Sequence, residues 1–262
     1  GNFSGLCLAE QSPVFFIIGG RGEYIISMRM RRETKKNLLL AGALALCFVF
    51  TLGICLSALV QTAVDTQNIT VVLDAGHGGI DGGVTGVNTG VKESEINLDI
   101  VKKLQVYLEQ AGINVVLTRK TDAGLYGLAV KGFKKRDMQK RKEIIERAAP
   151  AVMVSVHQNS YPRSARRGAQ LFYRAGSAEG ETLANNIQSE LNNMPECVQK
   201  STPLTGDYYM LDCTDYTSVI CECGFLSNPA DEALLVTDEY RDKIAAAVYK
   251  GILSYLSSAA NR

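Results

Sequence analysis

The chain has 262 residues, 46% of them hydrophobic, with 28 Lys and Arg, 27 Asp and Glu and only two histidines. This composition suits one domain with a sizeable core, once a non-globular N-terminal part is set aside. A net charge of +1 offers no basic face of the kind that nucleic-acid binding requires, so we expect no nucleic-acid partner.

An uncharged, apolar segment lies near the N-terminus, at 38–60. Its length exceeds the roughly 20 residues that a transmembrane helix needs. Basic residues between 29 and 36 precede it, and the positive-inside rule then places the N-terminus in the cytoplasm. No clear small-residue cleavage site follows, which favours an uncleaved anchor over a signal peptide. We therefore expect a membrane-anchored protein whose globular domain is extracytoplasmic.

The parts of the chain before and after this segment have different roles. Residues 1–37 are an extension with a basic flank, and Met28 and Met30 stand at the usual distance before such a flank. We therefore interpret 1–27 as a wrongly extended start and assign it no structure. Residues 61–68 are a linker, and 69–262 form the globular domain.

Strand and helix patterns alternate after residue 69. Strands are predicted at 69–73, 113–118, 151–156, 169–173, 208–211 and 218–223. Helices are predicted at 93–110, 135–148, 178–191, 229–236 and 238–256. This alternation predicts an α/β fold with one mostly parallel sheet covered by helices on both faces. The charge-dense stretch 131–147 is interpreted as a solvated helix face.

Both histidines follow or end a predicted strand. His77 lies in a glycine-rich turn after the first strand, and His157 ends the third. The ends of strands are where open α/β sheets build their sites. Imidazole is a common metal ligand, and it is found with carboxylates in catalytic zinc sites that keep a position for water. Taken alone, His77 also fits an ordinary turn, and His157 also fits a buried core position.

Two glutamates stand out beside the histidines. Glu222 lies inside an otherwise apolar strand, where an unpaired carboxylate is costly, so it must pair, protonate or bind a metal. A raised pKa there would suit a general acid and base. Glu93 opens a helix, a position that the helix dipole alone would favour. Glu95, two residues further on, is the alternative to Glu93 as the carboxylate of the site.

The cysteines of the domain do not have the spacing of a structural zinc ribbon. Cys221 and Cys223 lie on one face of a predicted strand and are interpreted as small buried hydrophobic residues. A disulfide between Cys197 and Cys213 is an open alternative for an exported protein.

Four short motifs occur in order along the domain. They are Asp74-x-Gly-His-Gly-Gly, Glu93-x-x-x-Asn97, Ser155-x-His-x-Asn159 and Glu222-x-Gly-Phe-Leu-Ser-Asn228. Together they resemble the zinc-dependent N-acetylmuramoyl-L-alanine amidases, the amidase 3 family, over about residues 69–256. The strand at 168–173 and the C-terminal helix further resemble the germination-specific amidases of spore-forming bacteria.

The resemblance implies a six-stranded sheet wrapped by helices, with His77, Glu93 and His157 as ligands of Zn²⁺ and Glu222 as the catalytic residue. It also implies a peptidoglycan substrate, hydrolysed between N-acetylmuramic acid and L-alanine. In the spore enzymes this is the first step toward the muramic-δ-lactam of the cortex, which would place the protein in the forespore or spore envelope. A regulatory protein partner is left open.

The sequence departs from the usual family pattern at two places, Ala75 for Pro and Glu146 for Asn. Three other functions are alternatives. A zinc peptidase acting on cell-wall peptides would use the same residues, whereas a glycosidase using Glu93 and Glu222 as its acid and base would leave both histidines idle. A non-catalytic wall-binding domain would be expected to lack one of the four residues, and none is missing.

Overall fold

The structure, a computed structural model, describes residues 15–20, 23–28, 36–37, 39–49, 51, 69–163 and 165–260. The chain divides into two compact units, Gly1–Thr62 and Ala63–Arg262. In the first unit, β1 (Phe15–Gly20) and β2 (Glu23–Met28) form an antiparallel pair, although the sequence pattern predicts no structure there.

The segment expected to span a membrane, 38–60, is only partly covered by the structure. Residues 39–49 and 51 are helical, whereas 38, 50 and 52–60 lie outside the described residues, as does the linker expected at 61–68. Among the residues that are described, no helix is both long enough and apolar enough to cross a bilayer.

The second unit is built on a six-stranded sheet with the strand order β4-β3-β5-β8-β6-β7. Its strands are β3 (Thr70–Ala75), β4 (Asn114–Leu117), β5 (Val152–Asn159), β6 (Gln170–Tyr173), β7 (Leu204–Thr205) and β8 (Ser218–Phe225). The strands β4, β3, β5 and β8 are parallel, whereas β6 runs antiparallel to β8 and pairs in parallel with β7. The predicted mostly parallel, six-stranded α/β fold is confirmed.

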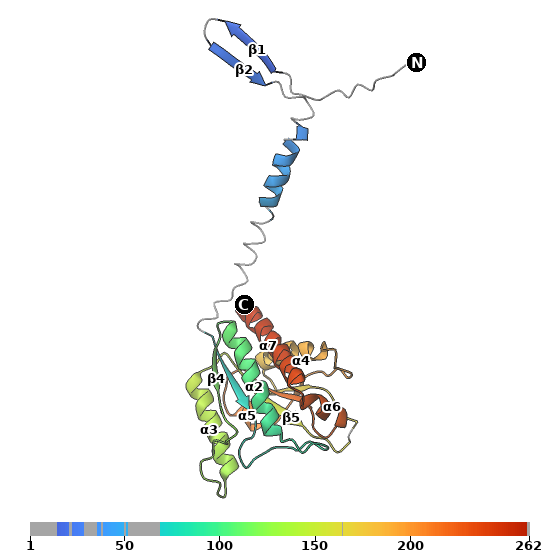
Figure 1. The fold of residues 1–262 in the computed structure, drawn as a ribbon. Coiled ribbons are helices and arrows are strands. Elements are labelled where there is room, and N and C mark those ends of the chain that lie inside the picture. Colours follow the sequence, from blue (N-terminus) through green and yellow to red (C-terminus); the bar gives the residue numbers. More distant parts are fainter. Residues whose placement is uncertain are drawn as a thin grey trace, which may run out of the picture. The chain divides into compact units, whose positions relative to one another are not determined.

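Helices cover both faces of this sheet (Figure 1). They are α2 (Glu93–Gln110), α3 (Phe133–Ala148), α4 (Ala178–Asn192), α5 (Tyr209–Asp212), α6 (Pro229–Leu235) and α7 (Asp238–Ala260). The larger core cluster lies between the sheet and α2, α4 and α7, and a smaller one joins the opposite face to α3 and α5. Because four parallel strands end at one edge, their following residues meet there.

The strand β8 shows how the sheet separates core residues from site residues. Val219, Cys221 and Cys223 belong to the larger core cluster, whereas Ile220 belongs to the smaller one on the opposite face. Because strand side chains alternate between faces, Glu222 projects on the side of Ile220, away from both cysteines. The two thiols lie 3.7 Å apart and are buried, as expected from the sequence.

This arrangement predicts that the two cysteines serve packing alone. Replacing both Cys221 and Cys223 with Ala should lower the free energy of unfolding by a few kcal/mol, because small cavities are left in the core. Metal content and reaction product should stay unchanged. Denaturant unfolding and metal analysis of the purified variant would check this, and loss of metal from a folded double variant would contradict it.

The structure differs from the sequence prediction at 208–211. These residues were expected to form a strand, but Tyr209–Asp212 form the short helix α5, whose Met210 and Leu211 pack into the smaller core cluster. The sheet edge is instead formed by β7. Cys197 and Cys213, for which a disulfide was an alternative, are both free thiols.

Candidate active site

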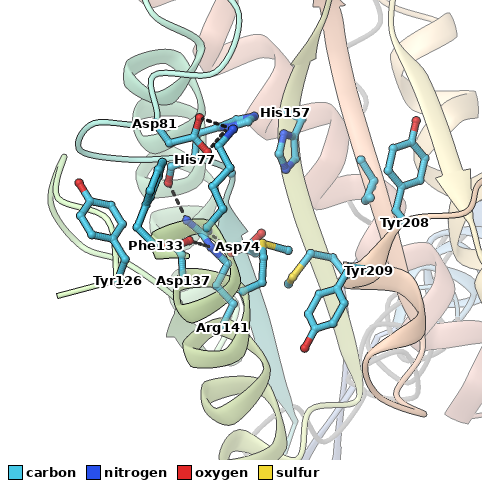
Figure 2. Close-up of a pocket in the computed structure, with 15 residues that line it drawn as sticks. Asp74, His77, Asp81, Tyr126, Phe133, Asp137, Arg141, His157, Tyr208 and Tyr209 are labelled. Atoms are coloured by element: carbon cyan, nitrogen blue, oxygen red, sulfur yellow. Dashed lines mark hydrogen bonds and ion pairs between the residues drawn. The ribbon is translucent and has the colours of Figure 1, made fainter. Parts of the chain in front are cut away.

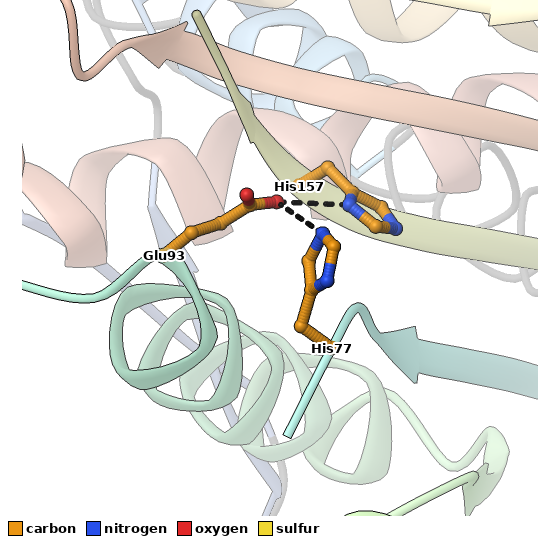
Figure 3. Close-up of side chains that lie close together, drawn as sticks. All are labelled: His77, Glu93 and His157. Carbon is orange, nitrogen blue, oxygen red and sulfur yellow. Dashed lines mark hydrogen bonds and ion pairs between the residues drawn. The ribbon is translucent and has the colours of Figure 1, made fainter. Parts of the chain in front are cut away.

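The three residues expected to bind a metal lie together at the carboxyl edge of the sheet (Figure 3). His77 follows β3, Glu93 is the first residue of α2, and His157 lies in β5. One ligand atom from each lies within 4.8 Å of the others. Glu93 Oε1 is 3.3 Å from His77 Nε2 and 2.9 Å from His157 Nδ1, so one carboxylate oxygen faces both imidazole rings.

Two glycines make room for this cluster. A Cβ atom at Gly76 would collide with the His157 ring, and one at Gly83 would collide with the carboxylate of Glu93. Gly83 also has a positive φ of 70°, a conformation that glycine adopts without steric cost. The glycines of the turn are therefore needed for the close approach of backbone to ligand side chains.

Neighbouring groups fix the orientation of two of the ligands, His77 and Glu93. His77 Nδ1 lies 3.1 Å from Asp81 Oδ2, and a proton shared there leaves Nε2 directed at the cluster. Glu93 Oε1 accepts hydrogen bonds from the backbone N–H of Gln158, at 3.0 Å, and from Asn97 Nδ2, at 3.2 Å. Asn97 thus explains the second half of the motif that begins at Glu93, while Asp81 was not singled out from the sequence.

The charges of the cluster suit a cation. Burial would raise the pKa of Glu93, but hydrogen bonds and charge from His157 and His77 lower it well below its usual range. Burial would lower the pKa of His77, yet Glu93 and Asp81 raise it overall. The site therefore presents an ionised carboxylate between two imidazole rings, and its negative charge favours a cation there. Glu95, the alternative to Glu93 as the carboxylate ligand, lies exposed on α2.

Glu222 lies beside this cluster without a partner of its own. It pairs in register with His157 across β5 and β8, and only 9% of the residue is exposed. Its Oε2 is buried and has no hydrogen-bond partner. Burial raises the pKa of Glu222 to about 7, against the opposing charge of His157. A carboxyl group with such a pKa can both take up and release a proton near neutral pH.

The raised pKa of Glu222 predicts a pH-dependent stability difference. The folded protein holds this proton more tightly than the unfolded chain, so the stability that the group confers is present below its unfolded pKa of 4.5 and is lost as pH rises through about 7. Glu222→Gln removes this loss. In the presence of a chelator, the free energy of unfolding of the variant should rise relative to that of wild type by about 3 kcal/mol from about pH 4 to about pH 8. Denaturant unfolding at both pH values measures the gain, and an unchanged difference would show an ordinary pKa.

The residues present fit a catalytic zinc centre. Two imidazole nitrogens and one carboxylate oxygen form the three-ligand set that leaves a fourth position for water or substrate. The unpartnered Oε2 of Glu222 supplies a proton acceptor next to that set. A structural zinc site would instead have four protein ligands, and the described residues offer only these three in one cluster.

A cavity of about 260 Å³ adjoins both histidines (Figure 2). Aromatic residues lie on two sides of it, Tyr126 and Phe133 on one and Tyr208 and Tyr209 on the other, and several charged side chains also line it. Lys134 lies at its rim and pairs with Asp81 at 3.3 Å. The cavity offers a binding space of mixed aromatic and charged character next to the two histidines.

The interpretation of the charged stretch 131–147 as a solvated face is only partly correct. Lys140 and Lys142 pair with acidic residues on the exposed face of α3, as expected. Asp137 and Arg141, however, are buried below the His77 turn. Glu146, which replaces the usual Asn, is exposed and pairs with Lys142.

This sheet, with its two histidines and two glutamates at the carboxyl edge, defines a class of cell-wall hydrolase. The chain belongs to the Amidase_3 family of N-acetylmuramoyl-L-alanine amidases, whose sequence profile matches residues 71–254. The protein is thus an enzyme of peptidoglycan amide hydrolysis, and its extracytoplasmic substrate agrees with the expected location of the domain.

Similar proteins indicate which members of this family the chain resembles. The germination-specific N-acetylmuramoyl-L-alanine amidase of Bacillus subtilis (strain 168) is 36% identical over 191 residues, which are 71% of this chain and 79% of that protein. The CwlD amidase from Clostridioides difficile, solved in complex with the GerS lipoprotein, is 37% identical with a TM-score of 0.70, over 73% of this chain and 100% of that one. The catalytic domain of CwlV from Bacillus (Paenibacillus) polymyxa is 28% identical with a TM-score of 0.63, over 72% and 98%. The chain therefore resembles CwlD-type germination amidases.

Proposed function

We propose that the protein is a zinc-dependent amidase that cleaves the bond between the lactyl group of N-acetylmuramic acid and L-alanine in spore cortex peptidoglycan. The observation that carries this proposal is the convergence of His77, Glu93 and His157 within 4.8 Å, beside the unpartnered carboxylate of Glu222. When bound, zinc supplies a Lewis acid that polarises a carbonyl group and acidifies water.

The protein's own residues divide the remaining work. His77, Glu93 and His157 hold the ion, and Asp81 and Asn97 keep two of these ligands in place. Glu222 takes a proton from the attacking water and delivers it to the nitrogen of L-alanine as the C–N bond breaks. The products are the free lactyl carboxyl group and a peptide with a free amino terminus. A pKa of Glu222 near 7 suits both transfers.

The name of one relative supports a proposal for the biological setting. Because the similar Bacillus subtilis enzyme is named germination-specific, we propose that this chain removes stem peptides as the first step toward muramic-δ-lactam. A zinc peptidase remains the alternative. Incubating purified enzyme with cross-linked cortex peptidoglycan and identifying the new ends decides between them. A new L-alanine amino terminus on intact stem peptides supports the amidase, and cleavage within the peptide supports the peptidase.

An accessory protein is part of the proposal, because the related CwlD structure contains a lipoprotein, GerS. We propose that a lipoprotein on the same side of the membrane binds this enzyme as well and regulates it. Mixing the purified domain with candidate lipoproteins of the host and measuring complex formation by size-exclusion chromatography tests this.

We further propose that 38–60 anchors the enzyme with its domain outside the cytoplasm and that 61–68 link the two. The uncharged sequence of the segment supports this, as does the exposure of Leu39, Leu40 and Leu44 on the described helical residues. Protease added to intact spheroplasts should remove the domain, while a cytoplasmic marker protein survives as the control. Full protection of the domain until lysis would contradict the topology.

A further inference from the structure

Arg141 is a buried cation directly below the turn that carries His77. It belongs to α3 and is 1% exposed. Its Nη1 donates to Asp74 Oδ1 at 2.5 Å and to the carbonyl of Ala75 at 2.8 Å, and its Nη2 donates to the carbonyl of His77 at 2.6 Å. Its Nε donates to Asp137 Oδ2 at 2.7 Å. Figure 2 shows the guanidinium between α3 and this turn.

A second buried arginine completes the hold on the turn. Arg119 is 3% exposed. Its Nε donates to the carbonyl of Ala75 at 2.8 Å, and its Nη2 donates to the carbonyl of Gly76 at 3.1 Å. Three successive carbonyls, from Ala75 to His77, are therefore each bound by a guanidinium.

The backbone at His77 requires such a hold. Its φ is 62°, a left-handed conformation that is unfavourable for a non-glycine residue and persists only where the surroundings impose it. A relaxed turn would swing the imidazole away from Glu93, because the ring follows its backbone.

Asp74 links this turn to the strand of the other histidine. Its carboxylate accepts hydrogen bonds from Thr118 Oγ1 and from Ser155 Oγ, both at 2.6 Å, in addition to Arg141. Although burial would raise the pKa of Asp74, Arg141 and the two hydroxyls lower it to about 2. Ser155 precedes His157 by two residues on β5, so one ion pair fixes the backbone next to both histidines.

Stability alone is a weak explanation for a charge pair at this depth. Buried ion pairs often contribute no more than well-packed apolar residues of the same size, because both charges lose their hydration. The smaller core cluster next to it, with Met153 and Ile220, shows that apolar packing is available on this face of the sheet. The ion pair is better explained by the geometry that it imposes on the turn.

We propose that Arg141, paired with Asp74, is a positioning residue that holds His77 ready for the metal and so sets the zinc affinity of the site. This inference rests on the proposed zinc ligands. Arg141 is not among the three clustered ligands, and it acts on them through the backbone of the turn. Its loss should act as loss of an outer-shell partner acts on metal sites, a change of about 10–100-fold in affinity.

The test uses Arg141→Lys, which keeps the charge but loses the planar, multiply bonded contact of the guanidinium. The matched control is Arg241→Lys, at a partly buried arginine of α7 that binds Asp99 of α2 and the carbonyl of Leu235. Zinc affinity is measured on the full chain by competition with a chromophoric chelator, and folding of the metal-free protein by circular dichroism.

We expect Arg141→Lys to bind zinc about 10–100-fold more weakly while keeping its fold, and Arg241→Lys to match wild type in affinity. At saturating zinc, Arg141→Lys should recover most of its turnover, which loss of a catalytic group would not allow. An unchanged affinity in folded Arg141→Lys would overturn the inference alone. A wild-type chain that binds no zinc would overturn the proposed function as well.

A second variant covers the case in which Arg141→Lys does not fold. Asp74→Asn keeps the size of the side chain but removes the negative charge that pairs with Arg141. A measurable fall in zinc affinity for folded Asp74→Asn supports the inference, and an affinity equal to that of wild type overturns it.

Discussion

Replacing Glu222 with Gln is expected to reduce amide hydrolysis by about 10²–10⁴-fold, the usual contribution of a general acid and base. Gln keeps the shape of the side chain but cannot carry the proton from water to the leaving nitrogen. The effect should fall on the turnover number, because Glu222 acts on the reacting atoms and does not line the cavity walls. Release of L-alanine amino termini from purified peptidoglycan provides the measurement.

Two controls accompany this variant. Zinc content should equal that of wild type, because Glu222 is not among the three clustered ligands. Replacing the exposed Glu95 with Gln makes the same chemical change on α2, outside the cluster, and should leave turnover unchanged. Activity of Glu222→Gln within about tenfold of wild type would contradict the assigned role.

Replacing His77 with Ala is expected to remove bound zinc and with it nearly all activity. Two remaining ligands would hold the ion far more weakly, because a catalytic zinc site normally rests on three protein ligands. The backbone of the turn should keep its conformation in this variant, since Arg141 binds the carbonyl of His77 and not its ring. Metal analysis after gel filtration gives the zinc content of each variant. Full zinc occupancy in His77→Ala would show that the ion, if bound, has other ligands.

The substitution Asp81→Asn tests the group that orients His77, whereas His77→Ala removes the ligand itself. The new amide group would remain within reach of His77 Nδ1, but the negative charge beside the ring would be gone. Zinc should therefore bind more weakly without being lost, in contrast to His77→Ala. The same metal analysis, repeated at several concentrations of a competing chelator, distinguishes the two results.

Much of the site could be predicted because its signals are local. His77 and His157 follow or lie in apolar strands. A carboxylate inside an apolar strand, as at Glu222, is rare unless it has a functional role. Parallel strands bring such positions to one edge. The mostly parallel sheet followed from the same alternation of strands and helices.

The features that escaped prediction depend on distant partners. A charge-rich helix gives no local sign that Arg141 is buried, because its partner Asp74 comes from another strand. The short apolar run at Met210 and Leu211 is equally compatible with a strand and a single helical turn, and packing against β8 decides for the turn. Asp81 was missed because its role depends on the fold of the turn.

The proposed ligand cluster also couples metal binding to the stability of the fold. His77, Glu93 and His157 come from the turn after β3, from α2 and from β5, so an unfolded chain presents them only as separate, weak donors. An ion that binds the native state alone stabilises it by about 1.4 kcal/mol for each tenfold excess over its dissociation constant. If the domain crosses the membrane before it folds, the supply of zinc outside the cytoplasm would determine how much of the enzyme persists against the proteases of the envelope.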